Sequence, residues 1–146
     1  MKVLINEKLE VGDIILTTTS SPISQAIRVA TKGDISHAML YVDTCSVVDA
    51  TLEGVQARNT QRILLEDDRT VHVLRLKENL STQDIIAVCD FVRARIGTRY
   101  SVKEAIRAGT GGRDTWSRKQ FCSRLVAQAY ASVDIHLVAD ENFCSP

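Results

Sequence analysis

A periodic apolar pattern near the carboxyl end is the feature that most constrains how this chain can fold. Between positions 122 and 133, apolar side chains recur at intervals of three and four residues: Cys122, Leu125, Val126, Ala129, Tyr130 and Val133. This spacing is typical of one face of an α-helix. We therefore predict a helix over Phe121–Ala131 whose apolar stripe packs against the core.

The first residue of that stripe is a thiol, and two interpretations of it are open. If the helix begins here, the unpaired N–H groups of its first turn and the helix dipole favour a thiolate at Cys122. The stretch Arg93–Arg124 has nine Lys or Arg residues and only two acidic ones, Glu104 and Asp114. This positive charge also favours a thiolate at Cys122, unless the basic residues form an ordinary solvated face. Alternatively, Cys122 is a small core residue, because free cysteine is among the most buried residue types.

Length and composition are those of an ordinary globular protein. The 146 residues suffice for a single domain over 1–146, with 45% of them hydrophobic and 25% charged. Basic and acidic residues balance at 18 each, so the net charge gives no indication of a nucleic-acid partner. The four cysteines, Cys45, Cys89, Cys122 and Cys144, contain no CxxC pair. Their spacing indicates neither a disulfide framework nor a zinc site, and we expect no metal and no cofactor.

Hydrophobic patterns and turn residues predict an α+β organisation with strands clustered in the middle of the chain. Strands are predicted at 11–17, 35–42, 46–50 and 71–76, and helices at 20–33, 81–96 and 102–108. The helix at 81–96 begins with a capping box at Ser81 and ends at Gly97. Residues 51–69 are predicted to form a long loop, and the glycine-rich residues 108–114 a mobile one.

The strands at 35–42 and 46–50 are predicted to form a hairpin whose turn, around Asp43 and Thr44, is not of the two-residue kind. With an odd number of loop residues, His37 and Asp49 point to the same face, because side chains alternate along a strand. In the simplest register, centred on Asp43, the two residues are directly opposed, with β-carbons roughly 4.5–5.5 Å apart. An imidazole and a carboxylate at that distance can form a hydrogen bond.

Cys122, His37 and Asp49 are the three groups that catalysis by a thiol nucleophile requires. His37 would take the thiol proton, Asp49 would orient the ring and stabilise its charge, and the backbone N–H of Cys122 would help to stabilise an oxyanion. The other histidines, His72 and His136, are predicted to be surface residues, because nothing supplies them with a nucleophile.

Four short motifs also occur in order along the chain: Gly12-Asp13-Ile14-Ile15, Ser36-His37-Ala38-Met39-Leu40-Tyr41-Val42, Gly97-Thr98-Arg99-Tyr100 and Phe121-Cys122-Ser123-Arg124-Leu125-Val126. Together they resemble the signature of the circularly permuted, papain-like NlpC superfamily, particularly its YiiX/YebB-like branch, to which the lecithin retinol acyltransferase-like enzymes are related. The resemblance spans about Gly12 to Tyr130. It implies a permuted papain-like α+β fold, in which a central antiparallel sheet packs against helices including the nucleophile helix.

The resemblance also implies roles for individual residues. Cys122 matches the nucleophile and His37 the base. Asp49 falls at the position of the family's third polar residue, where His or Glu is more usual, and Glu53 is the alternative for that role unless it is a solvated loop residue. Tyr100 matches a tyrosine that lies near the active site of such enzymes and assists the oxyanion; its alternative role is to pack behind the preceding glycine.

The function implied by the resemblance is that of a cysteine hydrolase working through an acyl-enzyme, as an amidase or peptidase on peptide or peptidoglycan-stem amides. Two alternatives stay open: a lipid-directed acyltransferase, thioesterase or phospholipase in peripheral contact with a membrane, and a non-catalytic binding module on the same fold. The apolar start of the chain is too short for a signal peptide and no stretch is long enough to span a membrane, so we expect a cytoplasmic location. A cell-wall substrate would then require export by a dedicated secretion system, as for an effector.

Overall fold

The computed structural model describes residues 1–18, 35–51, 53–99 and 114–139. The predicted helices at 20–33 and 102–108 and the predicted glycine-rich loop at 108–114 fall outside these residues, apart from Asp114 at the end of that loop. The expected strands lie in the described part, and so does the helix that carries Cys122.

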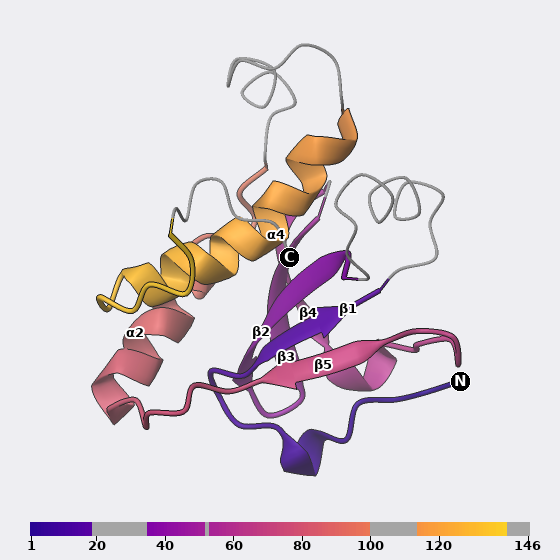
Figure 1. Cartoon of the computed structure of the whole chain (residues 1–146), viewed down its shortest axis with the longest axis horizontal. Coiled ribbons are helices and arrows are strands. Elements are labelled where there is room, and N and C mark those ends of the chain that lie inside the picture. The colour runs from indigo at the N-terminus through magenta and orange to yellow at the C-terminus, as the bar shows by residue number, and fades with distance from the viewer. Residues whose placement is uncertain (19–34, 52, 100–113, 140–146) are drawn as a thin grey trace.

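A five-stranded sheet forms the centre of the molecule (Figure 1). Its strands are β1 (Ile14–Thr17), β2 (His37–Asp43), β3 (Ser46–Thr51), β4 (Gly54–Asn59) and β5 (Val71–Leu74). They are arranged in the order β4-β3-β2-β1-β5, and every neighbouring pair is antiparallel. The two most buried strands, β2 and β3, are buried at every position between their terminal residues, so this part of the sheet is covered on both faces.

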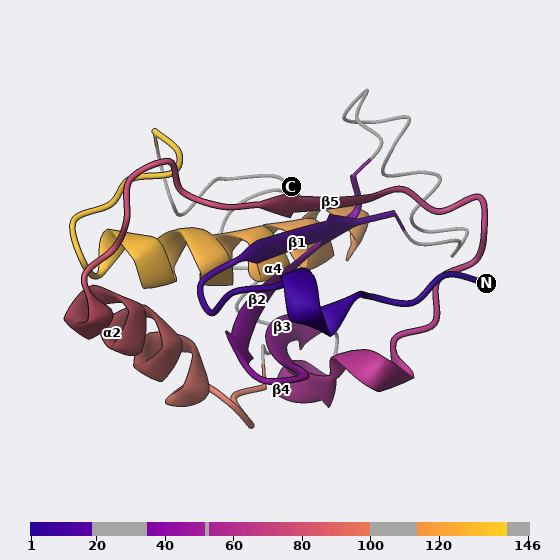
Figure 2. The ribbon, with the colours of Figure 1, turned by 90° about the horizontal axis from the view of Figure 1, so that it is seen from below.

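Two helices lie on one side of this sheet. Helix α2 (Thr82–Arg93) is capped by Ser81, whose hydroxyl accepts a hydrogen bond of 3.0 Å from the backbone N–H of Asp84, as the capping box predicted. Helix α4 (Asp114–Ala131) crosses the sheet, and α2 packs beside its carboxyl-terminal half (Figures 1 and 2). The structure thus has the α+β class that the sequence predicted.

The alternation of side chains divides the core into two layers. Even-numbered residues of β2 and β3, such as Leu40 and Val48, pack with Cys122, Leu125 and the rest of the predicted stripe between the sheet and the helices. Odd-numbered residues such as Met39 and Val47 form a smaller cluster on the opposite face. That face is partly covered by apolar residues of the amino-terminal segment and of the segment before β5, namely Leu4, Leu9, Ile63 and Leu65.

The prediction of a long loop over residues 51–69 is wrong. Strand β4 occupies the first part of this stretch, and the 3-10 helix η2 (Thr60–Arg62) follows it. Val55 and Gly54 are buried, whereas Ala57 and Asn59 are exposed at the edge of the sheet. The pattern of an edge strand is weak because few of its residues face the core, and residues of low strand propensity do not reveal it in the sequence.

Glycine is required at two positions where the backbone comes close to another segment. Gly54 has φ +115°, and a β-carbon there would lie 2.4 Å from the carbonyl oxygen of Thr98. This close approach joins the start of β4 to the segment that follows α2, through hydrogen bonds from Val55 N–H to Thr98 (3.1 Å) and from Gly97 N–H to Val55 (2.9 Å). Gly12 has φ +100° and accepts a hydrogen bond through its carbonyl from the hydroxyl of Tyr130 on α4.

An ion pair between a buried carboxylate and a partly exposed arginine lies next to Gly12. Asp13, 1% exposed, accepts hydrogen bonds from Arg75 on both oxygens, each of 2.7 Å, and a third of 2.8 Å from the backbone N–H of Glu10. Arg75 also donates to Glu10 and to the carbonyl of Lys8. The carboxylate is therefore fully used in holding the turn before β1 to the end of β5.

Candidate active site

His37 and Asp49 are in direct contact, as the sequence predicted, but their register differs from the predicted one. The His37 Nε2 atom lies 2.6 Å from Oδ2 of Asp49. Asp49 is directly opposite Met39, two residues further along β2, so the pair is diagonal. The prediction that His37 and Asp49 are directly opposed is therefore wrong, whereas the prediction that they share a face is confirmed.

The cause of this register is a two-residue turn combined with a bulge. Strand β2 ends at Asp43 and β3 begins at Ser46, with Cys45 in the left-handed region at φ 57°. The prediction that this turn is not of the two-residue kind is therefore wrong. The register shifts between Tyr41 and Asp43, which leaves Val42 as an extra residue on β2. Because one extra residue reverses which face the earlier side chains occupy, the bulge is what places His37 and Asp49 together.

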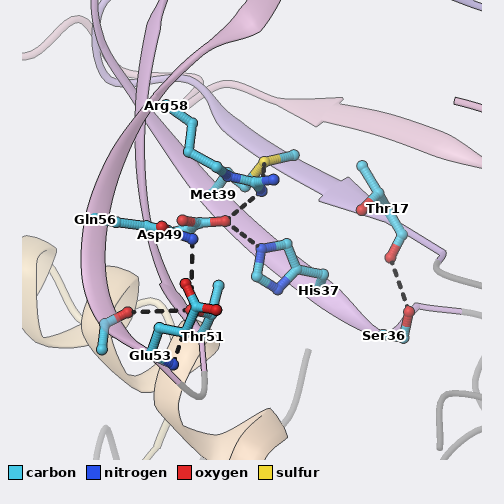
Figure 3. Close-up of polar contacts among 10 residues, drawn as sticks. Thr17, Ser36, His37, Met39, Asp49, Thr51, Glu53, Gln56 and Arg58 are labelled. Atoms are coloured by element: carbon cyan, nitrogen blue, oxygen red, sulfur yellow. Dashed lines mark hydrogen bonds and ion pairs between the residues drawn. The ribbon is translucent and has the colours of Figure 1, made fainter. Parts of the chain in front are cut away.

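Asp49 has a second cationic partner that the sequence did not indicate. Arg58 on β4 donates to the same carboxylate oxygen, Oδ2, that contacts His37 (Figure 3). Arg58 is directly opposite Val47, so it too reaches Asp49 diagonally, from the other neighbouring strand. The alternation of Val55 and Ala57 with Gln56 and Arg58 after Gly54 was the available signal, and it was too weak to outweigh the loop prediction.

The environment of His37 favours its protonated form. Burial lowers the pKa of the imidazole, but hydrogen bonds and electrostatic interactions with Asp49 and Cys122 raise the pKa to about 9. The His37 side chain is only 16% exposed, so solvent screens these interactions little. Since Nε2 contacts Asp49, the nitrogen available to the thiol is Nδ1, which lies on the side of the ring away from Asp49 (Figure 3).

Cys122 lies in the core between α4 and the sheet, with 1% of its surface exposed. The predicted apolar stripe of this helix is confirmed, because Leu125, Val126, Ala129 and Tyr130 are all buried. The predicted helix start is wrong, since α4 begins at Asp114 and Cys122 is near its middle. An N–H inside a helix bonds to the carbonyl four residues earlier. The predicted effect of a first helical turn on the thiol, and the predicted contact between the Cys122 N–H and an oxyanion, therefore do not hold.

The other candidates are placed as follows. Glu53 is exposed in the turn between β3 and β4, and its backbone N–H donates to the hydroxyl of Thr51 at 3.2 Å. Tyr100 lies outside the described residues. His72 and His136 are both exposed, as predicted, and Cys89 lies in the core. Of the two carboxylates considered for the third position, Asp49 is the one that contacts His37.

Nothing in the described part of the chain has the composition of a metal centre. Among residues 1–18, 35–51, 53–99 and 114–139, no three His, Cys, Asp or Glu side chains are grouped so that they could hold an ion. In the same residues, none of the helices is both long enough and apolar enough to pass through a bilayer.

Comparison with known proteins identifies the family. Residues 8–144 match the model of the peptidase C92 family, described as permuted papain-like amidase enzymes of the YaeF/YiiX type. None of the curated proteins matches the chain. Because the match covers nearly the whole sequence, this chain belongs to the permuted papain-like amidase family, and its antiparallel sheet packed against helices is the permuted papain-like fold that the resemblance implied.

Proposed function

We propose that this protein is a cysteine amidase in which Cys122 is the nucleophile, His37 the general acid–base and Asp49 the residue that orients His37. The observation that carries the proposal is the position of His37, which bonds a buried carboxylate through one nitrogen and interacts with a thiol as well. Two negative partners at one imidazole are typical of a thiol-activating histidine.

The resting site would hold a thiolate at Cys122 and an imidazolium at His37. The pKa of about 9 at His37 supports this state, because the ring then keeps its proton at neutral pH. Burial of both groups strengthens the attraction between them, since little water is present to screen it. Asp49 accepts the Nε2 proton of the ring, which leaves Nδ1 as the nitrogen that exchanges a proton with the thiol.

The reaction would proceed in two steps. The thiolate attacks the carbonyl carbon of the amide, the C–N bond breaks, and His37 gives its Nδ1 proton to the departing amine, which leaves a thioester on Cys122. A water molecule then attacks the thioester while His37 accepts one of its protons. The C–S bond breaks, the carboxylic acid is released, and the proton held by His37 restores the thiolate–imidazolium pair.

The substrate class we propose is a peptide amide, including the stem-peptide amides of peptidoglycan. Membership of an amidase family supports cleavage of a C–N bond. Transfer of an acyl group from a lipid would use the same thioester and differs only in the donor and acceptor. The experiment must therefore compare the two classes of acyl donor.

The test is to detect the acyl-enzyme by intact-protein mass spectrometry. Purified protein is mixed with peptidoglycan-derived muropeptides or with acyl-phospholipid vesicles, and digestion locates any adduct. We expect an adduct on Cys122 with the peptide substrates, loss of the adduct in Cys122→Ala, and a fall in turnover of about 10²–10⁴-fold in His37→Gln. Cys45→Ser, which removes a half-buried thiol remote from His37 in the fold, is the matched control and should retain activity.

Two results would overturn the proposal. One is turnover in Cys122→Ala equal to that of the unmodified protein, which would exclude Cys122 as the nucleophile. The other is an adduct formed only with the lipid donor, which would replace the amidase by an acyltransferase or lipid hydrolase on the same residues.

A further inference from the structure

We propose that Arg58 is a positioning residue of this site, which fixes the carboxylate of Asp49 in the orientation that His37 requires. This inference rests on the proposed function for its catalytic consequence, although the positioning itself can be measured without a substrate. Arg58 acts through Asp49, to which its guanidinium donates a hydrogen bond.

The geometry places Asp49 between two cationic side chains on neighbouring strands. His37 reaches it from β2 and Arg58 from β4, and both bonds end on Oδ2 (Figure 3). Asp49, on strand β3 between them, is fully buried, whereas Arg58 is 36% exposed at the sheet edge. The Arg58 guanidinium is held in place by a further contact of 3.4 Å between its Nη2 and the sulfur of Met39.

The other carboxylate oxygen shows why a second partner is needed. Within the described residues, Oδ1 of Asp49 is buried and makes no hydrogen bond. The two oxygens of a carboxylate are chemically equivalent and exchange places when the group rotates about the Cβ–Cγ bond. The contact with His37 alone therefore does not prevent this rotation. A donor approaching Oδ2 from the opposite strand adds a second restraint, and a charge-assisted bond of this kind is among the stronger hydrogen bonds.

Arg58 also affects the charge of the site. A fully buried carboxylate facing one imidazole would be costly, because desolvation of a charged group is compensated only when it is paired and hydrogen-bonded. Arg58 supplies a cation that does not lose its proton, so Asp49 keeps a charged partner when His37 becomes neutral during the reaction. Removal of Arg58 would lower the pKa of His37 if Asp49 lost its position, and would raise that pKa if only a positive charge were lost. Measuring the pKa of His37 therefore separates the two roles.

The experiment measures the pKa of His37 by NMR titration of the imidazole signals in the full-length protein. The chain has three histidines, so the His37 signals are assigned from their loss in His37→Gln. Arg58→Met removes the charge and keeps the aliphatic length, and Arg58→Gln is a second neutral variant should the first not fold. Arg75→Met is the matched control, because it removes an arginine from the other buried aspartate, Asp13.

If Arg58 positions Asp49, the pKa of His37 falls in Arg58→Met and Arg58→Gln, because the carboxylate no longer holds its bond to the ring. If Arg58 acts only as a nearby positive charge, its removal raises the pKa of His37, and if its role is only structural the pKa is unchanged. Either of these two results overturns the proposal. The control Arg75→Met should leave the pKa of His37 as it is in the unmodified protein.

A double-mutant cycle with Asp49→Asn adds a kinetic readout, the rate at which iodoacetamide alkylates Cys122. We expect Arg58→Met to slow alkylation by about tenfold in the unmodified background, the loss typical of one hydrogen bond to a charged group. In the Asp49→Asn background it should have little further effect, since there is no carboxylate to position. An equal loss in both backgrounds contradicts the proposal. A fall in the pKa of His37 without any activity on amides would leave Arg58 as a positioning residue and reject the amidase instead.

Discussion

Two buried aspartates of the same sheet, one just before β1 and one on β3, use their carboxylates in different ways. Asp13, before β1, accepts three hydrogen bonds spread over both oxygens, all from Arg75 and a neighbouring backbone N–H. Asp49 receives His37 and Arg58 on a single oxygen, and its other oxygen has no partner among the described residues. Full satisfaction is expected where a polar group only holds the fold, whereas incomplete satisfaction is more common at functional sites.

The partners differ as well as the number of bonds. Arg75 keeps its charge at all ordinary pH values, so the Asp13 pair is permanent. The imidazole of His37 can lose and regain a proton, so the contact with Asp49 can change during a reaction. The comparison predicts that substitution of Asp13 mainly lowers the free energy of unfolding, whereas substitution of Asp49 mainly lowers kcat.

The largest expected effect is on activity at Asp49. Asp49→Asn keeps the shape of the side chain but removes the charge that holds the His37 tautomer, so kcat should fall by roughly 10³–10⁴-fold. The comparison requires that Asp13→Asn, measured per folded molecule in the same amide-hydrolysis assay, retain kcat within about twofold of the unmodified protein. Comparable losses in the two variants would end the distinction between a functional and a structural aspartate.

Next in size is the effect on stability at Asp13. Asp13→Asn places an amide NH₂ against donors that now lack an acceptor, so the free energy of unfolding should fall by about 1–3 kcal/mol. Urea denaturation followed by circular dichroism measures this change. For the comparison to stand, Asp49→Asn must reduce stability less than Asp13→Asn does, because the Asp49 carboxylate accepts fewer hydrogen bonds.

A smaller effect concerns the pH dependence of stability. The pKa of His37 is raised in the folded protein from its ordinary 6.5 to about 9, so the folded state binds an extra proton between these values. The stabilisation is complete below about pH 6.5 and is lost as the pH rises through about 9. The measurement is the unfolding free energy of the unmodified protein minus that of His37→Gln at each pH. We expect this difference to decrease as the pH rises through that range. Asp13→Asn should show the same window as the unmodified protein, and Asp49→Asn a narrower one.

The smallest effect should come from Tyr130→Phe, next to Asp13. This change removes the hydroxyl that donates to the carbonyl of Gly12, and should lower the unfolding free energy by about 1 kcal/mol without changing kcat. Burial raises the pKa of Tyr130 to about 12, so the hydroxyl remains a donor over the whole range in which the protein can be assayed. A clear drop in kcat would show that the turn before β1 is coupled to the site.

Local patterns predicted much of this architecture. The stripe from Cys122 to Tyr130, the alternation in β2 and the capping box at Ser81 are each set by neighbours in sequence, and all three are confirmed. The start of α4 was missed because the apolar stripe begins at Cys122, whereas a helix continues wherever its backbone can, whether or not that turn is apolar. Residues before the stripe carry no periodic signal.

The site was harder to predict because it depends on contacts between strands. The identities of His37 and Asp49 could be inferred, but the register of their strands follows from the bulge at Val42, which no residue type marks. Arg58 was missed for a related reason: its function exists only once β4 is placed beside β3, and an arginine in an apparent loop looks like any solvated charge.

The bulge at Val42 also links the fidelity of folding to the integrity of the site. Without the extra residue, the same two-residue turn would pair Asp49 with Leu40 and would send Leu40 and Val48 to opposite sides of the sheet. A hairpin that closed in that alignment would expose core side chains and would be rejected by the same hydrophobic forces that assemble the helices on the sheet. The strand register that brings His37 to Asp49 is therefore also the register that packs the core, so a misaligned site would destabilise the fold.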